Sequence, residues 1–222
     1  MVTSERIRQN VRALESEIAE LRLDRSVEIL AVTKYSDIPS THLLFEAGLR
    51  HFGENRIQSA IPKIKTLPRD IHWSMIGHLQ TNKVAEAVAH FDRIQSVDSL
   101  RLLDKIQESA HKLDKKIDVF LQINMTQEPQ KYGFESASIL QEIPDITRYP
   151  NVKITGMMAF GPHTENEGEI RQSFQDSNAL FQQLKAALPS LSILSMGMSQ
   201  DFKIALACGA NQIRIGQRLI AE

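Results

Sequence analysis

Residues 28–35 read Glu-Ile-Leu-Ala-Val-Thr-Lys-Tyr, a short apolar run that ends on a lysine. Runs of this length with β-branched residues are typical of buried parallel strands. Ser36, Asp37 and Pro39 follow at once, so we expect the strand to end near Lys34 and a helix to begin near Pro39. Lys34 would then lie at the carboxyl end of the strand, where α/β folds bind their ligands.

Segments of this kind alternate with helical segments along the rest of the chain. The expected strands are 28–34, 51–55, 71–78, 91–97, 117–124, 152–160, 192–197 and 211–216. The expected helices are 3–23, 39–49, 54–66, 81–89, 98–113, 135–147, 169–187 and 200–208, and a polar loop is expected at 125–134. Eight alternations with short loops predict a single (β/α)₈ barrel domain over residues 1–222, with an extra N-terminal helix. An open, doubly wound sheet is the alternative that the same alternation permits.

The overall composition excludes several classes of protein. The net charge of −1 argues against a dedicated nucleic-acid binder, which needs a basic surplus. Cys208 is the only cysteine, which excludes internal disulfides and favours a reducing compartment. No apolar stretch is long enough to cross a membrane, and the N-terminus lacks the apolar core of a signal peptide. We therefore expect a cytoplasmic protein that binds neither nucleic acid nor membranes.

Polar residues or glycines stand where most of the expected strands end, whereas the strand bodies are apolar. The ends fall at Lys34, Asn55, His78, Ser96, Asn124, Phe160, Met198–Ser199 and Gly216. Each residue alone is a weak indication: His78 often serves as a helix cap, and asparagines often serve as turn residues. In a barrel, however, all the strands end at one rim, and the active sites of barrels are built from that rim.

The turns after the last two strands have the features of a phosphate site. Gly197 would let the backbone approach a ligand closely, and the N–H groups at 198–201 would begin a helix with unpaired donors. Ser199 could serve only as the N-cap of that helix, a role compatible with phosphate binding. Arg214 and Gly216 end the eighth strand, and barrels commonly bind phosphate after strands seven and eight. A lysine facing such a cradle suggests pyridoxal 5′-phosphate (PLP), whose aldehyde requires an amine.

Six short sequence motifs together point to a specific family of PLP-binding proteins. They are Ala-Val-Thr-Lys at 31–34, Phe-Gly-Glu-Asn at 52–55, Trp-Ser-Met-Ile-Gly-His-Leu-Gln-Thr-Asn-Lys at 73–83, Gly-Met-Met at 156–158, Ser-Met-Gly-Met-Ser at 195–199 and Arg-Ile-Gly at 214–216. In this order they resemble the pyridoxal phosphate homeostasis protein family, also called the YggS or PROSC family. That family is similar to the barrel domain of alanine racemase, and the resemblance covers essentially the whole chain.

The resemblance implies a role for each site residue. Lys34 would carry PLP as a covalent aldimine, and Arg214 would lie near the pyridine nitrogen and keep it unprotonated. The phosphate would be held by the turn containing Gly197, Met198 and Ser199 and by Gly216 and Gln217. Asn55, His78 and Met158 would complete the cofactor site. One departure matters: the family usually has Thr or Ser where this chain has Gln217, so a hydroxyl contact to the phosphate would be missing.

Three functions are compatible with these residues. The one we favour is a non-catalytic PLP-binding protein that takes part in PLP homeostasis or delivery, with indirect effects on amino-acid and keto-acid pools. Its partners would be apo PLP-dependent enzymes or a regulatory protein, and we expect a monomer without a metal site. The alternative is a PLP-dependent amino-acid racemase, but little sequence follows the eighth strand to form the second domain that such racemases carry. An isomerase-like phosphate-binding barrel is a third reading, for which only Glu54 offers a carboxylate base at a strand end.

Overall fold

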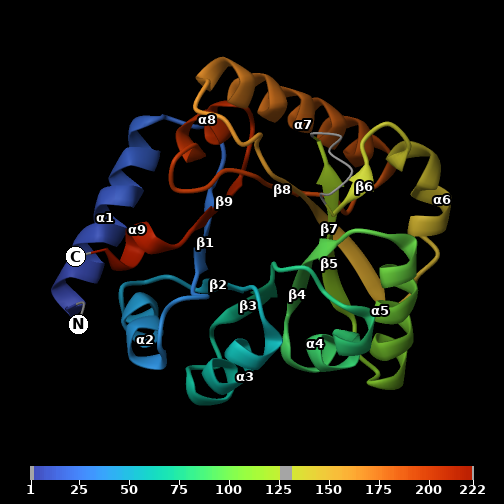
Figure 1. Ribbon diagram of the computed structural model, residues 1–222, viewed down its shortest axis with the longest axis horizontal. Coiled ribbons are helices and arrows are strands. Elements are labelled where there is room, and N and C mark those ends of the chain that lie inside the picture. The colour runs from blue at the N-terminus through green and yellow to red at the C-terminus, as the bar shows by residue number, and fades with distance from the viewer. Residues whose placement is uncertain (1–2, 126–131, 222) are drawn as a thin grey trace.

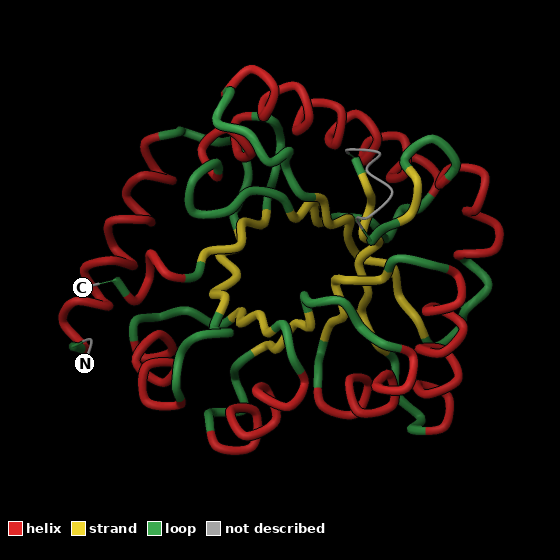
Figure 2. Tube along the Cα trace, viewed as in Figure 1, coloured by secondary structure: helices red, strands yellow, loops and turns green. Residues whose placement is uncertain are grey.

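The computed structural model describes residues 3–125 and 132–221, and its centre is a closed ring of parallel strands. The ring runs in the spatial order β4, β3, β2, β1, β9, β8, β7, β5, and the pairing of β4 with β5 closes it (Figure 2). Its strands are β1 (Glu28–Val32), β2 (His51–Glu54), β3 (His72–Met75), β4 (Arg93–Val97), β5 (Ile117–Asn124), β7 (Val152–Ala159), β8 (Ile193–Ser195) and β9 (Gln212–Ile215). This closure confirms the predicted barrel and rules out the open sheet.

Helices surround the ring on its outside (Figure 1). They are α1 (Ser4–Glu20), α2 (Ile38–Glu46), α3 (Ile57–Thr66), α4 (Val84–His90), α5 (Leu100–Lys112), α6 (Ile143–Ile146), α7 (Glu167–Ala187), α8 (Phe202–Ala207) and α9 (Gln217–Ile220). The extra N-terminal helix α1 packs beside the short α9, and Asn10 Nδ2 donates to the carbonyl oxygens of Leu219 and Ala221. No helix in the described part of the chain is long and apolar enough to span a membrane.

Several helix ends follow the signals in the sequence. The side chains of Thr3, Asp37 and Ser99 each accept a hydrogen bond from a first-turn N–H, as N-cap residues do. Gly48 has φ +105° directly after α2, in the left-handed conformation that ends many helices. These local signals set where α1, α2 and α5 begin and where α2 ends.

The structure corrects three of the predicted elements. Strand β1 ends at Val32, so Lys34 lies in a turn two residues beyond it. Ser199 is not a helix N-cap, because α8 begins only at Phe202 and Asp201 occupies the cap position. The helix expected at 135–147 is replaced by a two-residue strand β6 (Phe134–Glu135), a 3₁₀ turn (Ile139–Glu142) and the short α6.

The third correction has a physical cause. Pro144 lacks an N–H and is best accommodated in the first turn of a helix, which favours a new helix that begins at Ile143 over one that runs from 135 through the proline. The two residues of β6 pair with the end of β5 outside the ring. The loop predicted at 125–134 falls mostly on residues 126–131, which lie outside the described residues.

The amino ends of the strands are joined by a polar network opposite the rim. Glu28 of β1 lies 3.1 Å from Arg93 of β4 and 3.4 Å from the His51 ring of β2, and it accepts a hydrogen bond from Gln212 of β9. The ring of His51 also stacks on that of His72. Burial lowers the pKa of His51 below its ordinary value of 6.5; Arg93 and His72 act in the same direction, and Glu28 opposes them.

Candidate functional site

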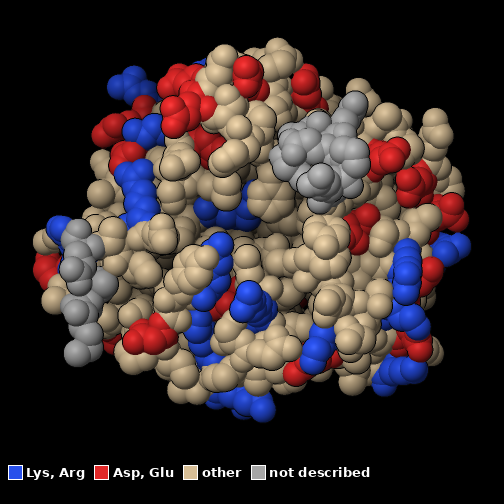
Figure 3. Space-filling model, viewed as in Figure 1, with Lys and Arg blue, Asp and Glu red and all other residues tan. Residues whose placement is uncertain are grey.

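The carboxyl ends of the parallel strands meet at one mouth of the barrel, and a cavity of about 1070 Å³ opens there. Figure 3 shows this face, with a hollow over the strand ring and Lys and Arg side chains beside it. Asn55, His78 and Met198 line the cavity, as the sequence predicts for rim residues. The other predicted site residues are not among its lining residues: Lys34, Met158, Gly197, Ser199, Arg214, Gly216 and Gln217.

Strand pairing brings Lys34 close to the turn that follows β9. β1 and β9 are hydrogen-bonded neighbours, with Ala31 opposite Ile215. A Cβ placed on Gly216 would lie 3.3 Å from the carbonyl oxygen of Val32, so the two turns nearly touch. The Lys34 side chain is exposed, and its Nζ lies 5.0 Å from the centre of the Tyr35 ring. No carboxylate among the described residues forms a salt bridge with Lys34.

The two turns expected to bind phosphate have free backbone donors. Gly197 has φ +93°, and a Cβ there would lie 2.5 Å from the Cβ of Ala205, so this turn requires glycine. The N–H of Met198 donates to Asp201 Oδ1 at 2.6 Å. The N–H groups of Ser199 and Gln200 have no partner within the described ranges, and the same is true of those of Gly216 and Gln217. Unpaired donors thus follow the carboxyl ends of both β8 and β9, which are parallel neighbours in the barrel.

Arg214 connects these turns to the strand ends below the mouth. Its guanidinium donates to the backbone oxygen of Ser195 at 2.8 Å, to the Ser195 hydroxyl at 2.9 Å and to the backbone oxygen of Ala159 at 2.9 Å. It lies 4.6 Å from the centre of the Phe160 ring, which lines the cavity. Burial lowers the pKa of Arg214 to about 10, against the opposing effect of Asp201. Arg214 is therefore still a cation at neutral pH.

Met158 lies in the barrel wall rather than at the mouth. It is fully buried in β7, opposite Ser195 of β8 in the strand register. Strand β8 lies between Met158 in β7 and Arg214 in β9, and Arg214 contacts the same Ser195 of β8. Met158 therefore belongs to the packing beneath the site.

His78 follows β3, across the barrel mouth from β8, and forms two contacts there. Its Nδ1 lies 3.2 Å from Oδ2 of Asp98, and its ring stacks on Tyr132 with 3.7 Å between the ring centres. Gln122 Nε2 donates to the backbone oxygen of Tyr132 at 2.7 Å. Tyr132 and Gln122 were not predicted as site residues, because Tyr132 lies within the predicted polar loop 125–134 and Gln122 lies inside an apolar strand.

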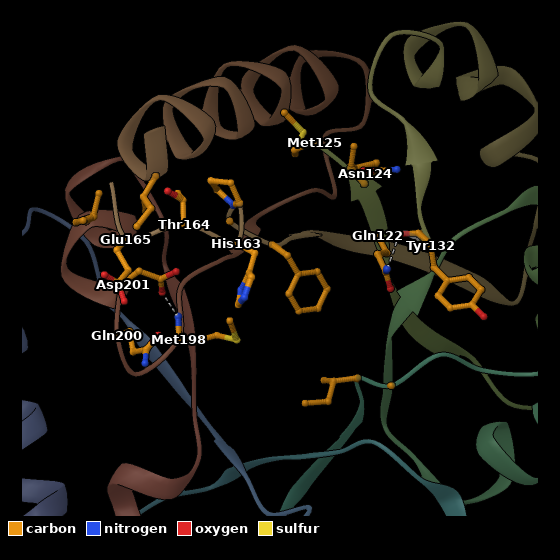
Figure 4. A pocket seen from close by; sticks show the side chains of 18 of the residues that line it. Gln122, Asn124, Met125, Tyr132, His163, Thr164, Glu165, Met198, Gln200 and Asp201 are labelled. Atoms are coloured by element: carbon orange, nitrogen blue, oxygen red, sulfur yellow. Dashed lines mark hydrogen bonds between the residues drawn. The ribbon is translucent and has the colours of Figure 1, made fainter. Parts of the chain in front are cut away.

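A third group of residues lies on the loop before α7 and on the turn before α8 (Figure 4). His163, Thr164 and Glu165 come from the loop, and Gln200 and Asp201 come from the turn. The side chains of these five residues are not among the site groups that the sequence predicts. These residues add polar and acidic groups to the side of the cavity opposite His78.

Glu54 cannot serve as a base in this cavity. Its carboxylate is fully buried and accepts hydrogen bonds from Thr33 and Lys63, and it is not among the cavity's lining residues. The isomerase reading therefore loses the only carboxylate that supported it.

The fold and this rim define the class of protein. The family model described as alanine racemase, N-terminal domain, matches residues 2–220. A structure of alanine racemase from Clostridium difficile superimposes with a TM-score of 0.79 at 19% identity, covering 98% of this chain and 56% of that one. At that identity the likeness establishes the fold alone.

Relatives with a higher sequence identity identify the family within this class. The pyridoxal phosphate homeostasis protein of Helicobacter pylori (strain 26695) is 36% identical, with 97% of this chain and 98% of that protein covered. A structure of PipY from Synechococcus elongatus with PLP bound has a TM-score of 0.86 at 34% identity, covering 97% of this chain and all of that one. The chain belongs to the pyridoxal phosphate homeostasis protein family, as its sequence motifs predict.

Proposed function

We propose that this protein binds PLP at the barrel mouth and acts in PLP homeostasis or delivery. The observation that carries the proposal is that the exposed Lys34 follows β1 at the same rim as two turns, 197–201 and 216–217, that contain the unpaired N–H groups of Ser199, Gln200, Gly216 and Gln217. The PLP-bound structure of PipY supports the same ligand class, since that protein shares the fold over its whole length.

The turns fit a phosphate group by their donors and by their shape. Backbone N–H groups at helix starts, together with the helix dipole, attract anions, and charge-assisted hydrogen bonds are the strong class. Gly216 and Gln217 supply such N–H groups at the start of α9, and Ser199 and Gln200 supply unpaired N–H groups in the turn before α8. A Cβ on Gly216 would lie 3.3 Å from the Val32 carbonyl oxygen, so glycine allows this turn to pack closely against the turn that carries Lys34. The exposed Gln217 has no hydroxyl, so in this proposal the phosphate is held mainly by backbone groups.

Lys34 is the proposed point of covalent attachment. Its nitrogen, as the free amine, would form a C=N bond to the aldehyde carbon, and one water would leave. Arg214, a buried cation at neutral pH, would disfavour a proton on the pyridine nitrogen if that atom lay near its guanidinium. Asn55 and His78 would contact the ring side from the opposite rim, while Met158 packs beneath.

We further propose that the protein holds and hands over the cofactor rather than catalysing a reaction on it. Relatives at 33–36% identity carry the name of homeostasis proteins and not of enzymes. Recipient apo PLP-dependent enzymes or a regulatory protein would be the partners. The cytoplasmic location and the monomeric state remain predictions from the sequence.

Absorption spectra and mass mapping test the proposal. The purified protein with added PLP should show a visible absorption band, and borohydride reduction followed by peptide mapping should place the adduct on Lys34. Lys34→Ala should stay folded and lose the band, because an exposed turn residue contributes little to core burial. Lys83→Ala is the control, since Lys83 is a lysine near the mouth paired with Glu86. A colourless protein, or an adduct mainly on Lys83 or Lys131, would contradict the proposal.

A further inference from the structure

A buried ion pair lies directly behind the turn that carries Lys34. Lys63 Nζ of α3 is 2.5 Å from Glu54 Oε1 at the end of β2, and both side chains are buried. Ser59 Oγ donates to the other carboxylate oxygen at 3.3 Å. Neither charge of the pair lines the cavity.

Both partners of the ion pair hold Thr33, the residue before Lys34. Lys63 Nζ donates to the backbone oxygen of Thr33 at 2.6 Å, and the Thr33 hydroxyl donates to Glu54 Oε1 at 2.7 Å. The Thr33 N–H donates to the oxygen of Gly53 at 3.0 Å, and its carbonyl also accepts from Ser36 N–H at 2.9 Å, which closes the turn. Every polar group of Thr33 is thus fixed by a neighbour.

Stability alone is a poor reason for this arrangement. Removing two charges from water is costly, and apolar side chains of similar volume often serve a core as well or better. The geometric result of the pair is more specific, because it fixes the backbone immediately before Lys34. The Lys34 side chain itself is long and exposed, so its reach is defined only by where its Cα is held.

We propose that Glu54 and Lys63 are positioning residues that act through Thr33 to aim Lys34 at the aldehyde of PLP. The inference rests on the proposed function, since it assigns a role in attachment at Lys34. Small displacements of a reacting group can slow a reaction by up to about a hundredfold, so a loosened turn should slow attachment more than it weakens phosphate binding.

The test separates covalent attachment from non-covalent binding. Stopped-flow absorbance measures the rate at which PLP attaches, and calorimetry measures the affinity for pyridoxine 5′-phosphate, which has the phosphate and ring but no aldehyde. Thr33→Val replaces the hydroxyl that donates to Glu54 with a methyl group at nearly constant shape, and Thr33→Ser retains the hydroxyl. The double variant Glu54→Gln/Lys63→Met removes both charges without leaving one of them alone in the core. Lys65→Met, at an exposed lysine of the same helix, is the matched control.

We expect Thr33→Val and the double variant to attach PLP roughly tenfold or more slowly, with the affinity for pyridoxine 5′-phosphate unchanged. Thr33→Ser and Lys65→Met should behave like the wild type. An unchanged attachment rate in the folded double variant, or an equal loss for both ligands, would overturn the positioning role. If Thr33→Val does not fold, the double variant alone decides. A wild-type protein that ignores PLP would instead refute the proposed function.

Discussion

The guanidinium of Arg214 donates to both the backbone oxygen and the hydroxyl of Ser195, so one buried cation joins β9 to β8 at the level of the proposed site. Arg214→Lys keeps the charge but loses the planar fork that makes these bonds. We expect a loss of about 1–3 kcal/mol in the free energy of unfolding, because buried acceptors lose their donors. Urea denaturation measures it, with the exposed Arg69→Lys as control. Equal stability of the two variants would contradict this role.

Gly197→Ala and Gly48→Ala form a matched pair. Both glycines have positive φ, but a Cβ at Gly48 meets nothing within 4 Å, whereas one at Gly197 meets Ala205 at 2.5 Å. Both variants should lose about 1–2 kcal/mol through backbone strain. Gly197→Ala should lose more and should also bind pyridoxine 5′-phosphate more weakly, because α8 must move. Indistinguishable denaturation curves and affinities would show that the turn at 197 does not need its glycine.

The phosphate should contribute much of the non-covalent affinity for the cofactor. Several unpaired N–H groups converge on its proposed position, and pyridoxal without phosphate leaves them unused. We expect pyridoxal to bind far more weakly than PLP in equilibrium titrations. Comparable affinities for the two compounds would argue against the cradle at 197–201 and 216–217.

The stability of the barrel should fall as the pH drops below about 6.5, and His51 should contribute to the fall. Burial lowers its pKa in the folded state, so the unfolded chain takes up the proton first. The free energy of unfolding therefore rises with pH in this window and falls on acidification. Urea denaturation at pH 7.5 and 5.5 should show a smaller difference for His51→Gln than for the wild type. His42→Gln, on the exposed face of α2, serves as control and should retain the full difference.

Racemisation of alanine should be negligible even when PLP is bound. Two-base proton transfer requires an acid or base on each face of the substrate, and Lys34 supplies one. Tyr35 lies beside Lys34 on the same turn and is 72% exposed, while Tyr132 is stacked on His78. Incubation with L-alanine and separation of the enantiomers tests this, in parallel with reactivation of an apo PLP-dependent enzyme. Turnover at ordinary enzyme rates would restore the racemase alternative.

The barrel could be predicted because its signals are local. Apolar runs, caps such as Ser99 and glycines such as Gly48 report on their own segments, and alternation then leaves few topologies. Motifs also indicated Lys34 and the two phosphate turns, whose roles stay predictions. The single-domain expectation for residues 1–222 likewise remains a prediction.

What the sequence did not reveal depends on contacts between distant segments. The stack of His78 on Tyr132 and the pairing of Glu54 with Lys63 arise only once the barrel closes. The sequence predicts Ser199 as a cap because Ser and Asp are both good N-cap residues, and only the path of the chain places Asp201 at the cap position of α8. The hydrophobic periodicity of the sequence does not indicate which distant residues will pair or which of two candidate residues will cap a helix.

The pairing of β1 with β9 has a consequence for how the protein acquires its site. Glu28 and Gln212 are 184 residues apart in sequence, so their pairing closes a long loop. The chain loses conformational entropy in closing this loop before the completed barrel can stabilise it. Lys34 and the Gly216 turn lie on opposite sides of that junction, and a chain that has formed only its early strands has no cofactor site. A ligand bound across the junction would favour the closed barrel by mass action, so cofactor supply and folding yield would be thermodynamically linked.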